Sequence, residues 1–105
     1  MIKLKSKEEI EIMKKGGKII AGILAGISDI VAPGVSIKDL DDKARELCAK
    51  HNVTPVFLGY KPSGAARPFP AALCVSINEQ IVHGIPNEAD KEGNFRTLKE
   101  GDIVS

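Results

Sequence analysis

The stretch of residues 73–87 (LCVSINEQIVHGIPN) constrains this chain more than any other, because it has the pattern of a β-hairpin that carries a histidine. Its first half alternates apolar and polar residues, as in a half-buried strand. Residues 78–80 then predict a turn, and Ile81-Val82 predicts a second short strand that ends at His83. Gly84 has no Cβ, so another segment can approach closely behind the imidazole. The pattern predicts a histidine at the rim of a cleft, and the competing interpretation is a neutral histidine on the surface or at a strand end.

Length and composition fit one small soluble domain of 105 residues. Aromatic residues are only 4% of the chain and Trp is absent, so the core must be aliphatic. The formal net charge is +1 and there is no basic block, which argues against a nucleic-acid or membrane partner. Residues 1–5 are too polar to predict a signal peptide, and we expect Cys48 and Cys74 to be reduced thiols. These features predict a cytoplasmic protein.

Two helices are predicted by their start and stop signals. Ser6 and Glu9 have the spacing of a capping box, and the apolar pattern that follows predicts a helix over residues 7–31, ended by Pro33-Gly34. Ser36 and Asp39 form a second capping box before a helix that ends near residue 50. Four glycines inside the first helix favour close packing against a neighbour.

Short strands are expected after the helices. Residues 53–58 predict a strand at a sheet edge or bulge because Pro55 lacks a donor, and residues 103–105 predict another. Between them, Tyr60 and Phe69 lie in a Pro/Gly-rich loop, where they either wall a pocket or pin the loop to the core. The predicted fold class is α+β, with two amino-terminal helices packed on a small, mostly antiparallel sheet. The predicted core contains Ile19, Ile23, Ile27, Leu40, Leu47, Val75 and Ile77.

Residue types alone give no complete catalytic set. Cys48, His51, Cys74 and His83 could bind zinc, but their spacing differs from that of structural zinc sites. Cys74 and His83 could form a nucleophile pair. The competing interpretation is that Cys74 is a packed, inert thiol. The acidic residues of the helices, Asp41 among them, are expected on solvated faces.

The order of motifs resembles a known family. KSKEEIEIMKKGGKI, PGVS, FLGY, LCVSINEQIVHGIP and LKEGDIVS follow one another as in the amino-terminal half of type I methionine aminopeptidases, which are metallopeptidases of the pita-bread fold. The resemblance covers residues 1–105 and implies a single domain with a partial pita-bread fold. It implies removal of the initiator methionine from new polypeptides.

The resemblance also implies roles for individual residues. His83 matches the histidine that hydrogen-bonds the substrate near the metals without being a ligand, and so is the expected catalytic residue. The residues that match the methionine side-chain pocket are Phe57, Tyr60, Phe69 and Cys74. The family holds divalent metal ions (cobalt, manganese, iron or zinc) through two Asp, one His and two Glu, all of which lie beyond Ser105. Asp102 matches a turn residue.

The same resemblance implies a truncated fold. We expect this chain to bind no metal tightly and to have no aminopeptidase activity alone, and the alternative is a non-catalytic module that binds a peptide or a partner. Residues 103–105 are expected to form an edge whose backbone groups lack partners, which favours self-association.

Overall fold

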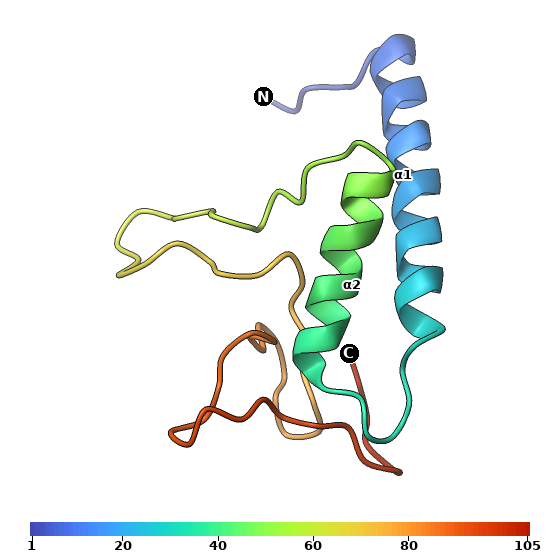
Figure 1. The fold of residues 1–105 in the computed structure, drawn as a ribbon. Coiled ribbons are helices and arrows are strands. Elements are labelled where there is room, and N and C mark those ends of the chain that lie inside the picture. Colours follow the sequence, from blue (N-terminus) through green and yellow to red (C-terminus); the bar gives the residue numbers. More distant parts are fainter.

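Two antiparallel helices form one side of the structure, a computed structural model that describes all 105 residues. Helix α1 spans Lys7–Ser28 and helix α2 spans Ile37–Lys50. Residues 51–105 contain turns and extended backbone that pack beside α2 (Figure 1). Neither helix is long and apolar enough to cross a membrane.

Both predicted capping boxes are confirmed. The Ser6 hydroxyl accepts a hydrogen bond from the Glu9 amide at 3.1 Å, and the Glu9 carboxylate accepts one from the Ser6 amide at 2.7 Å. Ser36 and Asp39 repeat this arrangement at 3.3 and 3.2 Å. These bonds satisfy amides that a helix start leaves without intrahelical partners. Helix α1 ends at Ser28, three residues earlier than predicted, and residues 29–30 form a turn before Pro33.

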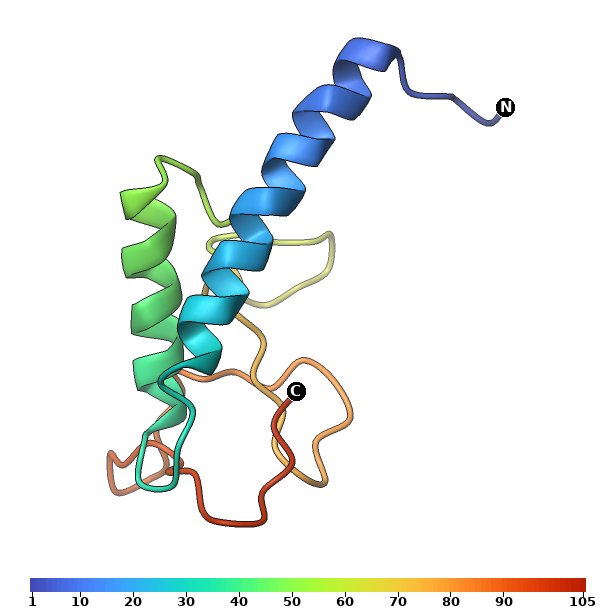
Figure 2. The ribbon, with the colours of Figure 1, turned by 90° about the vertical axis from the view of Figure 1, so that its right-hand side faces the viewer.

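Close packing explains only one of the glycines in α1. A Cβ on Gly26 would lie 2.8 Å from a methyl carbon of Leu47 in α2, whereas a Cβ on Gly16, Gly17 or Gly22 would meet no atom within 4 Å. Residues 7–18 are all exposed, and this half of α1 extends beyond the rest of the molecule (Figure 2). The glycine-based prediction of close packing is therefore confirmed at Gly26 and wrong at Gly16, Gly17 and Gly22.

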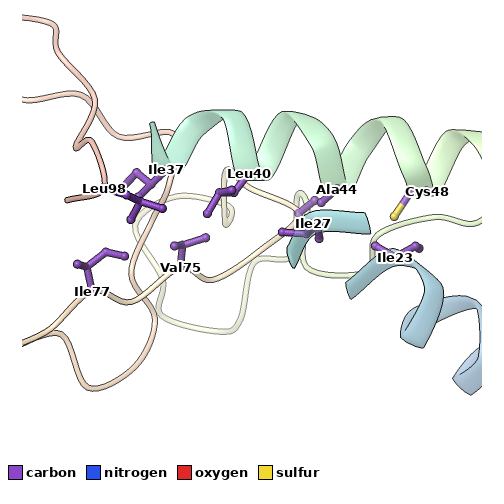
Figure 3. Close-up of a cluster of buried hydrophobic side chains, with 10 residues drawn as sticks. Ile23, Ile27, Ile37, Leu40, Ala44, Cys48, Val75, Ile77 and Leu98 are labelled. Carbon is purple, nitrogen blue, oxygen red and sulfur yellow. The ribbon is translucent and has the colours of Figure 1, made fainter. Parts of the chain in front are cut away.

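The core is aliphatic, as predicted, and lies between the two helices and the chain that follows them (Figure 3). Ile19 and Leu47 pack against the core while remaining partly exposed. The predicted core residues that are buried are Ile23, Ile27, Leu40, Val75 and Ile77. They are joined by Ile37, Ala44, Cys48, Ala72 and Leu98.

The predicted antiparallel sheet is wrong. The structure has no strand, and its only β-pairings are two isolated bridges, Ser36 with Thr97 and Ile77 with Val104. Residues 73–83 do not form a hairpin ladder. The φ of 60° at His83 is outside the extended region, and the one backbone hydrogen bond between residues 73–77 and 81–84 joins Val75 to Gly84. Residues 53–58, where Pro55 removes a donor, also form turns and not a strand.

Residues 103–105 pair with residues 76–78. Ser76 and Ser105 exchange two backbone hydrogen bonds of 2.8 and 2.9 Å, and the Asn78 amide donates to the Ile103 carbonyl at 3.0 Å. The expectation that this segment lacks backbone partners is therefore wrong along the side that faces residues 76–78. The pairing is too short to count as a strand.

This pairing should depend on the charge of Asp102. Hydrogen bonds from the Asn78 side chain and the Lys99 amide lower the pKa of Asp102 below its ordinary value of 3.8. A carboxyl whose pKa is lower in the folded state stabilises that state fully above the unfolded pKa, and the contribution is lost as pH falls through the folded pKa. We therefore expect the protection factor of the Ile103 amide, the exchange rate of an unstructured chain divided by the rate measured by NMR at the same pH, to decrease at pH values below 3.8. An Asp102→Asn variant should lack this pH dependence, and an unchanged profile would contradict the prediction.

Candidate functional site

One cavity of about 470 Å³ lies beside the helical pair. A loop with its flanking residues forms one wall, and residues from 73–87 form the other. Its eleven lining residues include Pro62, Ala65, Arg67, Pro68, Pro70 and Ile85. They also include all five residues singled out from the sequence, namely Phe57, Tyr60, Phe69, Cys74 and His83. The structure thus brings together side chains that lie up to 26 positions apart in the chain.

The loop wall (residues 59–70) is closed at its base by backbone hydrogen bonds. The Gly59 amide donates to the Phe69 carbonyl, and the Phe69 amide donates to the Tyr60 carbonyl, both at 2.8 Å. The ring of Phe69 also packs edge-on against Phe57, with 6.4 Å between ring centroids. Phe69 therefore lines the cavity, and its backbone closes the base of the loop. Its contacts are with Phe57 and the loop itself and not with the buried core.

His83 is exposed and stands in an unusual backbone conformation. Its φ of 60° is in the left-handed region, which non-glycine residues seldom occupy. The next residue, Gly84, is buried and bonded on both sides: its amide donates to the Ser76 hydroxyl at 3.1 Å, and its carbonyl accepts from the Val75 amide at 2.9 Å. A Cβ on Gly84 would lie 2.0 Å from the Val75 carbonyl oxygen. The backbone contact that fixes the position of His83 thus requires glycine at residue 84.

Asp41 supports the Cys74 side of the cavity, and its prediction as a solvated acid is wrong. Its side chain is fully buried, and one carboxylate oxygen accepts from the amides of Ala72 and Leu73 at 2.7 and 3.0 Å. The other oxygen accepts from Nε of Arg45 at 2.8 Å. Arg45 in turn donates to the carbonyl of Pro70 at 2.9 Å. Helix α2 therefore holds the segment that leads into Cys74.

The sequence analysis did not identify the polar side chains that bond across the parts of the chain around the cavity. Asn87 donates to the Pro70 carbonyl at 2.6 Å, and Arg67 forms an ion pair with Glu88. The Asp41–Arg45 spacing of four residues on a helix was the one available signal for a buried pair. Nothing in the spacing of Arg67 and Glu88, 21 residues apart, indicates that they meet.

The residues present do not form a metal site. No group of three or more His, Cys, Asp or Glu side chains is close enough to hold an ion. Cys74 and His83 line the cavity, but no carboxylate does. Cys48 is buried in the core between the helices and does not line the cavity that holds Cys74 and His83.

Comparison with known proteins agrees with the motif order. The model of metallopeptidase family M24 matches residues 11–105. The chain belongs to family M24. Among curated M24 relatives, methionine aminopeptidase from Aquifex aeolicus is 43% identical over 104 residues, and that from Clostridium perfringens is 42% identical over 105 residues. These alignments cover 99% and 100% of this chain.

Solved structures of M24 relatives share the fold. Methionine aminopeptidase from Thermotoga maritima aligns with a TM-score of 0.80 and 40% identity, covering 99% of this chain and 37% of that one. The enzyme from Rickettsia prowazekii aligns with a TM-score of 0.82 and 36% identity. The chain spans 38% and 37% of the length of the two curated relatives above.

Proposed function

We propose that this M24 chain is the amino-terminal part of a cytoplasmic methionine aminopeptidase, which removes the initiator methionine from new polypeptides. The observation that carries the proposal is the cavity, where Tyr60, Phe69, Cys74 and His83 line one space. The chain that builds this cavity is 43% identical to a methionine aminopeptidase.

The chemistry of the cavity walls suits a methionine side chain. A thioether is flexible and polarisable, and it makes favourable contacts with aromatic rings such as those of Phe57, Tyr60 and Phe69. A volume of about 470 Å³ is within the range of small-ligand pockets. His83 lies on the same cavity and is exposed, so its ring can form a hydrogen bond with the backbone of a bound peptide.

Binding and hydrolysis are separate in this proposal. A divalent metal (cobalt, manganese, iron or zinc) would supply an activated water and polarise the scissile carbonyl when bound. The cavity offers no carboxylate for it, so we assign the ligands to the carboxyl-terminal part of an M24 enzyme. The 105 residues should then bind the peptide without cleaving it. Taken alone, this chain would therefore behave as a peptide-binding module. We also propose that two copies of the chain associate through residues 103–105, along the side of this segment that does not face residues 76–78.

A peptide titration tests the proposed function. We expect a Met-Ala-Ser peptide to shift the NMR signals of Tyr60, Cys74 and His83, and a Glu-Ala-Ser peptide to leave them unchanged. Loss of one aromatic wall in Tyr60→Ala should weaken binding by about three- to tenfold. The matched control is Phe95→Ala, because Phe95 packs beneath Lys38 and does not line the cavity.

Two outcomes would contradict the proposal. Equal shifts with both peptides would show that the cavity does not select a methionine side chain. Turnover of the Met-Ala-Ser peptide by the 105-residue chain with added cobalt or manganese, abolished by chelator and by His83→Ala, would show that these residues complete a catalytic site.

A further inference from the structure

The ion pair between Arg67 and Glu88 joins the two sides of the cavity. Arg67 is in the loop wall and lines the cavity, whereas Glu88 follows the residues of the opposite wall, three positions after Ile85. Their side chains are 62% and 51% exposed, so the pair lies at the solvent-facing rim and not on the cavity floor. We name this contact the mouth pair.

The mouth pair is also the only side-chain hydrogen bond or ion pair that joins the tip of the loop to the rest of the chain. Residues 61–68 have no helical or strand structure, and their one backbone bond, from Ala65 to Pro62, is internal to the loop. No other hydrogen bond or ion pair of a side chain connects residues 61–68 to the rest of the chain. Figure 1 shows this loop (yellow) extending away from the helices. Beyond the closed base, one polar contact therefore joins the loop tip to the opposite wall.

We propose that the mouth pair is a latch that sets the width of the cavity mouth. When the pair is formed, as in this structure, the tip of the loop is held toward the wall that carries Cys74 and His83. When it breaks, the loop swings about its hydrogen-bonded base and the mouth, through which His83 is already exposed, becomes wider. The latch acts on any ligand that enters the cavity, so it does not depend on the identity of the peptide.

Alkylation of Cys74 reports on opening. Cys74 lines the cavity and is half-buried, whereas Cys48 is buried between the helices and serves as an internal control in the same molecule. The probe is iodoacetamide, which is uncharged, and peptide mass spectrometry separates the two sites. Exposed ion pairs contribute little, so Arg67→Gln and Glu88→Gln should each raise the rate at Cys74 by about two- to fivefold. The rate at Cys48 should not change.

Comparing Arg67→Gln with Glu88→Gln distinguishes a latch from a direct electrostatic effect on the ionisation of the Cys74 thiol. Removing a positive charge near a thiol lowers the thiolate fraction, and removing a negative charge raises it, so direct electrostatics would shift the two rates in opposite directions. A latch predicts that both rates rise. It also predicts that the double variant Arg67→Glu/Glu88→Arg restores the original rate, and that high salt raises the rate of the unmodified chain.

A matched control removes an ion pair of similar exposure at a distant place. Glu11→Gln breaks the pair with Lys14 on α1, whose side chains are 64% and 63% exposed, and should leave the rate at Cys74 unchanged. Opposite shifts in Arg67→Gln and Glu88→Gln, or no change in either, would overturn the proposal.

Discussion

Replacing Gly84 with alanine is expected to lower the free energy of unfolding by about 3 kcal/mol. The added Cβ would lie 2.0 Å from the Val75 carbonyl oxygen and 2.8 Å from its carbonyl carbon. Both obstacles are backbone atoms in the buried core segment, so no side-chain rotation relieves the clash. The chain must instead move apart, which breaks the 2.9 Å hydrogen bond between the Val75 amide and the Gly84 carbonyl.

Urea denaturation followed by circular dichroism measures this change. The matched control is Gly16→Ala, since a Cβ at Gly16 meets no atom within 4 Å and lies in the exposed half of α1. That substitution should stabilise the protein by up to about 1 kcal/mol through helix propensity. The NMR signals of His83 should shift in the Gly84→Ala variant and should not shift in the Gly16→Ala control. A Gly84→Ala variant as stable as the unmodified chain would show that residues 75 and 84 are not held together in solution.

Local signals in the sequence predicted the features that depend on few residues. Ser6 with Glu9, and Ser36 with Asp39, form capping boxes because the required groups are three residues apart on a helix start. The helical apolar spacing identified the buried stripe of Ile23 and Ile27. These contacts are set by chain geometry over one or two turns, so spacing alone is sufficient to predict them.

The backbone pairing of residues 73–78 could not be predicted in the same way. Alternation at residues 73–78 correctly placed Val75 and Ile77 in the core, but it does not identify a partner. The bridge partner of this stretch is the segment around Val104, whereas the residues that follow the turn contribute one backbone hydrogen bond, from the Val75 amide to the Gly84 carbonyl. The φ of 60° at His83, which ends the extended backbone there, has no signal in residue type other than the glycine beside it.

The cavity was predicted through the family resemblance and not through residue spacing. The residue pattern gave His83 with a glycine behind it and offered Tyr60 and Phe69 as possible pocket walls. The motif order added Phe57 and assigned it with Tyr60, Phe69 and Cys74 to one pocket. Arg67 was missed because an arginine in a Pro/Gly-rich loop is ordinarily a solvated residue. Its partner Glu88 becomes apparent only once the loop is placed beside the opposite wall.

Asp41 shows the limit of helical periodicity most clearly. The residue is between Leu40 and Asp42, and a carboxylate there is expected to face solvent. Its burial depends on three donors, the amides of Ala72 and Leu73 and the guanidinium of Arg45, two of which lie more than 30 residues away. A buried carboxylate is stable only when such donors surround it, and they are assembled by the tertiary fold.

We therefore expect Asp41→Asn to lower the free energy of unfolding by about 3 to 5 kcal/mol. Asparagine retains one oxygen for the amides of Ala72 and Leu73, but its amide nitrogen would then face Nε of Arg45, which is also a donor. Turning the side chain over would restore the contact with Arg45 and lose both amides. Either orientation leaves buried donors without acceptors, and the charge that balanced the guanidinium is gone.

Asp42→Asn is the matched control, because Asp42 is the adjacent acid on α2 and is 54% exposed in its ion pair with Lys38. Its loss should cost less than about 1 kcal/mol by the same urea measurement. Because Asp41 holds the segment that leads into Cys74, its substitution should also shift the NMR signal of Cys74 and weaken binding of the Met-Ala-Ser peptide, whereas Asp42→Asn should do neither. Equal destabilisation by the two variants would mean that Asp41 is solvated in the protein, and that α2 does not support this side of the cavity.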